Sequence, residues 1–277
     1  MFPKISEKNM TGKRKQKVVR QKSSVFYSFL FSSEREINPF YPEYSILLKT
    51  AESVNSFHDL YKVSRSGASG GPSTHEQQDL YRAMLIFACA GLDVFVKKLV
   101  KDKLSQLLPV DKEVEKKFME YVQKGLKDEK ILNTVALALI NPVPRDIFLN
   151  EYIKSMTGDS LQSVEALCTV SNASGLDTKK IFSKTKIDSI KEAFDVRNQI
   201  IHEMDINVED STSRTTGYRT RRQRISTTME KHTKNILDLA GELFIAYKEK
   251  FERYKIGVKK EQVVVSTPRV KITPRSK

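Results

Sequence analysis

Apolar residues recur at steps of three and four along most of the chain, and strict alternation of apolar and polar residues is scarce. This is the period of an amphipathic helix and not that of a strand. The pattern predicts long helices over residues 41–63, 79–99, 186–204 and 221–254, with several shorter helices between residues 111 and 182. The fold class that follows is an all-α helical bundle.

The most apolar of these helices is the one over residues 79–99. Between residues 83 and 96 it carries one charged side chain, Asp93, and apolar residues or glycine occupy the whole circumference. Such a helix belongs in the centre of a bundle. Ser73, followed three residues later by Glu76, predicts a capping box at its start, directly after a flexible Gly/Ser stretch.

The same pattern divides the chain into four parts. We expect a basic, flexible N-terminal tail over residues 1–24 and an extra helix with its Gly/Ser linker over 25–75. A helical domain follows over residues 76–254, with a helical insertion at 111–182. Residues 255–277 form a second basic, flexible tail.

Composition and targeting signals agree with a soluble, charge-rich globular protein. Hydrophobic residues make up 39% of the 277 residues and charged residues 30%. Apolar runs are shorter than the roughly 20 residues of a membrane span, and the N-terminus has no apolar secretion segment. Cys89 and Cys168 lie singly in apolar segments, which predicts free thiols, a cytoplasmic location and no membrane partner.

The net charge of +14 is concentrated at the two ends of the chain. Residues 1–22 hold eight Lys or Arg against one Glu, and residues 255–277 hold seven against one Glu. Basic arms of this kind attract a polyanion such as RNA, because phosphate contacts release counterions without a fixed shape. A role in solubility alone is the alternative.

The helix over residues 186–204 places one charge on its apolar side. At about 100° per residue, Arg197 falls within the half-circle that also holds Ile190, Phe194, Val196, Ile200, Ile201 and Met204. Asp195, Asn198 and His202 cluster on the polar side. An arginine therefore occupies a position that should face other helices.

Arg197 needs an anion beside it, because an arginine stays protonated and its unpaired burial costs several kcal/mol. Asp93 is one candidate, and the two would then form a buried ion pair that fixes the helix register. The other candidate is a bound phosphate. His202 can exchange protons near neutral pH, but it lies about 140° from Arg197 on an ideal helix. The two can converge if the helix ends there or if a second subunit completes the site.

The string from Arg197 to His202, RNQIIH, resembles the R-x4-6-H motif of the HEPN superfamily, in which Asn commonly follows the Arg. The apolar helix over residues 79–99 is similar to the RiboL-PSP-associated HEPN branch, with its Asp/Arg start and later Leu-Asp pair. The resemblance covers residues 76–254, although 111–182 match only as helices. It implies an α-helical bundle and a homodimer that joins two motifs in one cleft.

The resemblance also implies an activity, that of a metal-independent endoribonuclease without a cofactor. Arg197 and His202 would be the catalytic pair and Asn198 a supporting residue, with Asp93 and Asp195 nearby. Attack of an RNA 2′-hydroxyl on the adjacent phosphate would use His202 for proton transfer and Arg197 for charge neutralisation.

A run of arginines follows the motif after a short polar loop. It could be a solvated face, or it could bind the RNA backbone. Its members are Arg214, Arg219, Arg221, Arg222 and Arg224.

The leading interpretation is a toxin or antiviral ribonuclease, with an antitoxin or regulatory protein as a further partner. The alternatives are a non-catalytic HEPN module and a nucleic-acid scaffold that acts through its basic tails.

Overall fold

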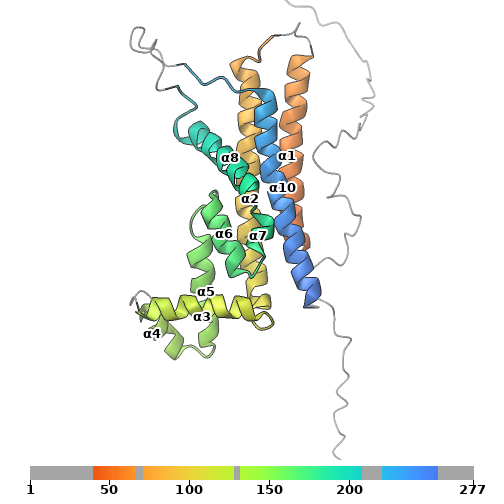
Figure 1. Cartoon of the computed structure of the whole chain (residues 1–277). Coiled ribbons are helices and arrows are strands. Elements are labelled where there is room, and N and C mark those ends of the chain that lie inside the picture. Colours follow the sequence, from red (N-terminus) through yellow and green to blue (C-terminus); the bar gives the residue numbers. More distant parts are fainter. Residues whose placement is uncertain (1–39, 67–70, 128–131, 208–219, 255–277) are drawn as a thin grey trace, which may run out of the picture. The chain divides into compact units, whose positions relative to one another are not determined.

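The computed structural model describes residues 40–66, 71–127, 132–207 and 220–254, and its regular elements there are helices (Figure 1). The all-α prediction is confirmed. The predicted basic tails, residues 1–24 and 255–277, lie outside the described residues. The helices are α1 (Tyr41–Arg65), α2 (His75–Leu107), α3 (Lys112–Lys127), α4 (Leu132–Ile140), α5 (Pro144–Thr157), α6 (Val164–Ala173), α7 (Thr178–Ile181), α8 (Lys184–His202) and α10 (Ser226–Arg253).

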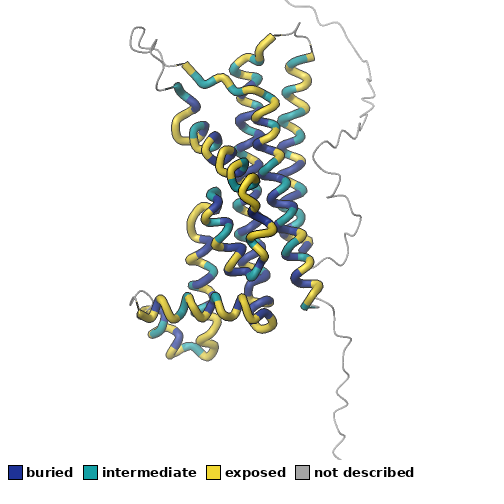
Figure 2. The backbone as a smooth tube through the Cα atoms, viewed as in Figure 1, coloured by how far each residue is buried: buried dark blue, intermediate teal, exposed yellow. Residues whose placement is uncertain are grey.

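Helix α2 is the central element, because it packs against α1, α5, α8 and α10. Its inward positions, such as Leu85, Leu92 and Leu99, are fully buried, and Figure 2 shows the buried faces of α1, α2 and α10 turned toward one another. The helix is not covered on every side, however. Phe87 is 46% exposed and Val94 52% exposed, so an apolar circumference overstates the burial of this helix.

Helices α1 and α2 approach closely at one glycine. A Cβ atom added to Gly91 would lie 2.1 Å from Oγ1 of Thr50 on α1. The glycine therefore brings the two helices together, as expected where one backbone meets a neighbouring side chain. Helices α1 and α2 pack against each other within one compact unit, and the division of the chain at residue 76 stays a prediction.

The capping box at the start of α2 lies one residue later than predicted. Thr74, not Ser73, is the N-cap: its Oγ1 accepts a hydrogen bond from the Gln77 N–H at 3.3 Å, and Gln77 Oε1 accepts one from the Thr74 N–H at 3.1 Å. Ser73 instead shares a hydrogen bond with the Tyr61 hydroxyl at 3.0 Å. The contact across the Gly/Ser connection thus decides which hydroxyl caps the helix.

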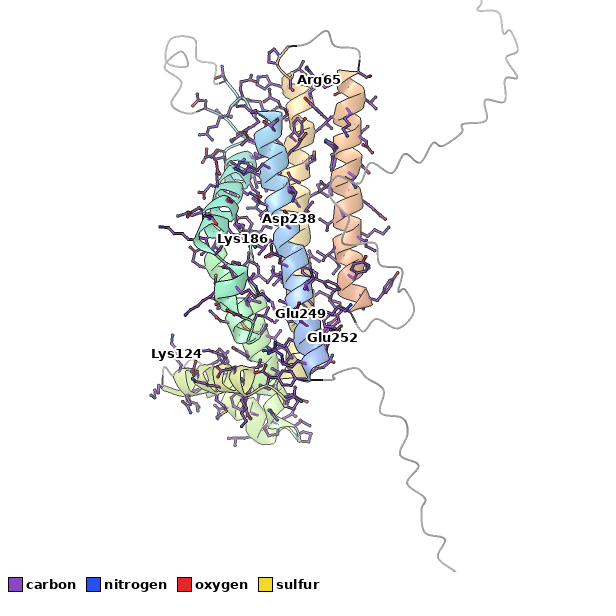
Figure 3. All side chains as sticks on the ribbon, turned by 45° about the vertical axis from the view of Figure 1, so that its right-hand side comes forward. Arg65, Lys124, Lys186, Asp238, Glu249 and Glu252 are labelled. Carbon is purple, nitrogen blue, oxygen red and sulfur yellow. The ribbon has the colours of Figure 1, made fainter. Side chains whose placement is uncertain are left out.

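Helix α10 begins at Ser226 and not at Arg221, because the preceding residues bond to another segment. Arg221 forms an antiparallel β-bridge with Ile206, and the Arg222 N–H donates to the Asp205 carbonyl oxygen at 2.7 Å. Further along, Lys186 of α8 forms an ion pair with Glu242 of α10, and Lys186 lies beside α10 in Figure 3.

The short helices α3 to α7 cover residues 111–182 and pack onto the long helices through α5, α6 and α7. A buried ion pair ties the start of this region to α10, since Lys250 bonds both Asp111 and the Gly175 carbonyl oxygen. None of the described helices combines the length and the apolar character required to cross a membrane.

Candidate functional site at the end of helix α8

Arg197 faces the neighbouring helices from a half-buried position on α8. Burial raises the pKa of the Cys89 thiol on α2 to about 12, and the charge of Arg197 opposes that rise. Arg197 therefore lies close to α2, as the helical spacing predicts. Its Nη1 donates to Asn198 Oδ1 at 2.8 Å, while its buried Nε has no hydrogen-bond partner among the described residues.

The ion pair between Arg197 and Asp93, one of the two alternatives for the anion beside Arg197, is not formed. Asp93 Oδ1 accepts a hydrogen bond from the Leu161 N–H at 2.6 Å, and its Oδ2 lies 3.0 Å from Lys97 Nζ. The acidic side chain thus anchors the segment before α6. In the described part of the chain, Arg197 has no carboxylate within ion-pair distance.

His202 is the last residue of α8 and is exposed to solvent. Asp195 and Asn198 are exposed as well, so the predicted polar face is confirmed. His202 makes no hydrogen bond to any described residue. The helix ends at this histidine, which meets one of the two conditions under which it and Arg197 can converge.

Exposed apolar side chains surround His202 in the sequence and in the local fold. Ile201 and Met204 were expected to face the core, yet Met204 is 69% exposed and Ile201 also lies at the surface. Ile201 lies in the last turn of α8, and Met204 lies in the turn that follows the helix. Ile225, which follows the Arg224 that binds Asp205, is 68% exposed.

The turn after His202 contains a buried carboxylate that the sequence analysis missed. Met204 and Asp205 have positive φ angles of 52° and 56°. Asp205 is fully buried; its Oδ2 accepts a hydrogen bond from Arg82 Nε at 2.7 Å, and it forms an ion pair with Arg224. Arg224 also donates to Gln199 Oε1 at 2.8 Å, which links the turn back to α8.

The arginines predicted to bind RNA are engaged with carboxylates where the structure describes them. Arg221 binds Asp79 through two hydrogen bonds of 2.6 and 3.1 Å, and Arg222 binds Glu203 at 2.7 Å. The Arg221 hydrogen bonds lower the pKa of Asp79 below its usual range. Arg224 binds Asp205 and Gln199 and thereby stabilises the turn after α8. Arg214 and Arg219 lie outside the described residues, and RNA binding by this group stays a prediction.

One residue in the sequence, Arg82, could have indicated the ion-pair network around Asp205. Arg82 lies at the border of the most apolar helix, and its burial demands an anion for the same reason that was applied to Arg197. Asp79 and Asp205 are the carboxylates that supply it, the former at 3.0 Å from Arg82 Nη1.

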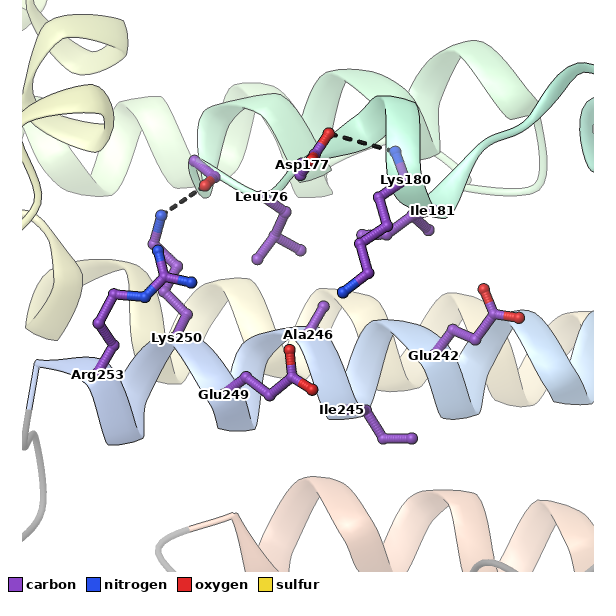
Figure 4. A pocket seen from close by; sticks show the side chains of 11 residues that line it. Leu176, Asp177, Lys180, Ile181, Glu242, Ile245, Ala246, Glu249, Lys250 and Arg253 are labelled. Carbon is purple, nitrogen blue, oxygen red and sulfur yellow. Dashed lines mark hydrogen bonds between the residues drawn. The ribbon is translucent and has the colours of Figure 1, made fainter.

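A separate cavity of about 380 Å³ lies between residues 175–181 and α10, away from the motif (Figure 4). Lys180, Lys250 and Arg253 line it together with Asp177, Glu242 and Glu249. The two signs of charge balance, and Lys250 is already paired with Asp111. Across the described ranges, no three His, Cys, Asp or Glu side chains gather as metal ligands.

Comparison with known families decides the relationship. The RiboL-PSP-HEPN family model matches residues 47–216, from within α1 through α8 and beyond. The chain belongs to the RiboL-PSP-HEPN family. The match to this HEPN family begins inside α1, which the sequence resemblance over residues 76–254 did not cover, and it includes residues 111–182, which had matched only as helices. Searches of curated proteins and of solved structures found no match.

Proposed function

We propose that this HEPN protein is a metal-independent endoribonuclease whose active site is built on the string from Arg197 to His202. The observation that carries the proposal is that Arg197 differs in its pairing from the four arginines of the network around Asp205. Arg82, Arg221, Arg222 and Arg224 each bind a carboxylate, whereas Arg197, inside the motif, has none among the described residues. A guanidinium without a carboxylate partner, on the same helix as an exposed histidine five residues later, is suited to a phosphate.

In the proposed reaction, the RNA 2′-hydroxyl attacks the adjacent phosphorus, and the 5′-oxygen of the next nucleotide leaves. His202 takes the proton that the 2′-hydroxyl releases and delivers it to the departing 5′-oxygen, since an imidazole exchanges protons near neutral pH. Arg197 neutralises the charge that develops on the phosphorane. Asn198, which accepts a hydrogen bond from Arg197 Nη1, orients the guanidinium.

A homodimer is part of the proposal. Ile201, Met204 and Ile225 are exposed apolar residues next to the motif, and a second copy of the chain would cover them. Two motifs would then share one cleft. The basic residues of the predicted tails and of the loop with Arg214 and Arg219 would add attraction to RNA.

A cytoplasmic role as a toxin or antiviral effector, held in check by an antitoxin or regulatory partner, completes this interpretation. It rests on the family relationship and on the reactive site. No cofactor enters the proposed chemistry.

The test is incubation of the purified protein with total RNA and then with tRNA in EDTA, beside the His202→Ala variant. Cleavage by the wild type alone supports the proposal. Equal RNA binding by both proteins without any cleavage would instead identify a non-catalytic HEPN module.

A second candidate function is a nucleic-acid scaffold, favoured by the concentration of the +14 net charge in the two ends of the chain. Removing residues 1–22 and 255–277 would abolish the activity of a scaffold. For an enzyme, the same truncation should reduce the salt dependence of RNA binding while cleavage at low salt persists.

A further inference from the structure

We propose that Asp205 is the positioning residue of the active site, because its buried carboxylate clamps the turn that begins directly after His202. This inference rests on the proposed function, in which His202 transfers a proton. Asp205 would not touch the RNA. It would act by holding the end of α8 in one conformation.

The backbone of this turn adopts a conformation that must be imposed from outside. Two consecutive non-glycine residues, Met204 and Asp205, have positive φ angles. A left-handed backbone conformation is disfavoured for residues with a Cβ atom and persists where its surroundings enforce it. Strain of this kind clusters at functional sites, and here it begins two residues after the histidine.

The enforcing contacts come from three separate segments and meet on Asp205. Arg82 of α2 donates from Nε to Oδ2 at 2.7 Å, and Arg224, from the segment before α10, donates from Nε to both carboxylate oxygens at 3.1 Å. The Asp205 N–H donates to the Gln199 carbonyl oxygen of α8 at 3.0 Å. Asp205 therefore joins α2 and the segment before α10 through its carboxylate, and α8 through its backbone N–H.

The clamp also reaches the motif itself. Arg224 bonds Gln199, which lies between Arg197 and His202, and Arg222 bonds Glu203, the residue after His202. The Arg82 guanidinium closes the arrangement by donating to the Arg222 carbonyl oxygen at 2.8 Å. The backbone at His202 is thereby held on both sides by residues that bond to the partners of Asp205.

The experiment compares Asp205→Asn with Asp111→Asn in the full-length protein. Asparagine keeps the size of the side chain and tolerates the left-handed backbone, so the main change is the charge. Asp111 is the matched control, since it is buried and ion-paired with Lys250 but lies apart from α8. Both variants should melt at a lower temperature than the wild type.

Only Asp205→Asn should lose catalysis. We expect kcat for RNA cleavage to fall about 100-fold well below the melting temperature, the loss typical of a misplaced catalytic group, with KM nearly unchanged. Asp111→Asn should keep kcat within about threefold of the wild-type value, because its ion pair with Lys250 lies apart from the catalytic residues. A kcat for Asp205→Asn within the same range as the control would overturn the proposal.

A second readout does not depend on ribonuclease activity. The chain has 4 histidines, so selective labelling of the imidazoles gives a short NMR spectrum in which His202→Gln identifies one signal. In Asp205→Asn the His202 signal should shift or split, and in Asp111→Asn it should not. An unmoved His202 signal refutes the positioning role even if the wild type cleaves no RNA, whereas absent cleavage alone refutes the proposed function.

If Asp205→Asn does not fold, Arg224→Lys tests the same clamp at its more accessible arm. Lysine keeps the positive charge, but it lacks the planar guanidinium with which Arg224 donates to Asp205 and Gln199 at the same time. A moved His202 signal supports the proposal, and an unmoved one overturns it.

Discussion

The carboxylate of Asp205 accepts a hydrogen bond from Arg82 Nε at 2.7 Å, although 123 positions separate the two residues in the chain. Both side chains are buried. The pair joins the first turns of the central helix α2 to the turn that follows His202. Arg82, and not Arg197, is thus the arginine whose buried ion pair stabilises the fold.

This difference predicts losses of stability of different size for two arginine substitutions. Arg82→Ala leaves Asp205 buried with Arg224 as its remaining cation and should lower the free energy of unfolding by about 3–5 kcal/mol. Arg197→Ala removes no ion pair seen among the described residues, so it should lower the free energy of unfolding by much less than Arg82→Ala does. Urea denaturation of both variants measures the difference. Equal losses would mean that Arg197 also has a structural anion.

The close approach of α1 and α2 predicts a steric conflict that a second substitution relieves. A methyl group at Gly91 would meet the Thr50 side chain, so Gly91→Ala should destabilise the protein by about 1–3 kcal/mol. Thr50→Ala removes two of the atoms in conflict. In a double-mutant cycle followed by chemical denaturation, the double variant should therefore recover part of the loss. Additive losses would contradict direct contact.

A buried histidine on α10 predicts how stability depends on pH. Burial lowers the pKa of His232 from its usual 6.5, with Glu192 opposing and Lys231 and Arg224 adding to the effect. The unfolded chain then binds a proton that the folded chain excludes, so stability is lost as the pH falls below about 6.5 and is retained above it.

Urea unfolding between pH 5.5 and 7.5 tests this prediction. His232→Gln should reduce the loss of stability at low pH, while His202→Gln, at an exposed imidazole, should leave the pH dependence as it is in the wild type. If His232→Gln keeps the full pH dependence, other groups cause it.

The sequence predicts the helices and the polar face of α8 well, because both depend on local periodicity. Asp195, Asn198 and His202 are exposed and Arg197 turns toward α2, as their spacing requires. The partners of buried charges are not local. The Arg82–Asp205 pair spans most of the domain, and Asp205 lies in a turn after the helix, where no period applies.

The start of α10 and the exposure of Ile201 and Met204 differ from the prediction because they also depend on contacts between segments that are distant in the sequence. Residues 221–225 read as the first turns of a helix, but their hydrogen bonds go to the turn at Asp205 and Ile206. Helical periodicity cannot show where a neighbouring helix stops covering an apolar face.

The most direct test of the central claim is the chemistry of the RNA ends. Purified wild-type protein and His202→Ala are incubated with tRNA in EDTA, and the termini are analysed by phosphatase and kinase treatment followed by mass spectrometry. We predict that the wild type produces 2′,3′-cyclic phosphate ends and that His202→Ala, folded and RNA-binding, produces none. Cleavage that requires Mg²⁺ and leaves 3′-hydroxyl ends, or that persists in His202→Ala, would contradict the account.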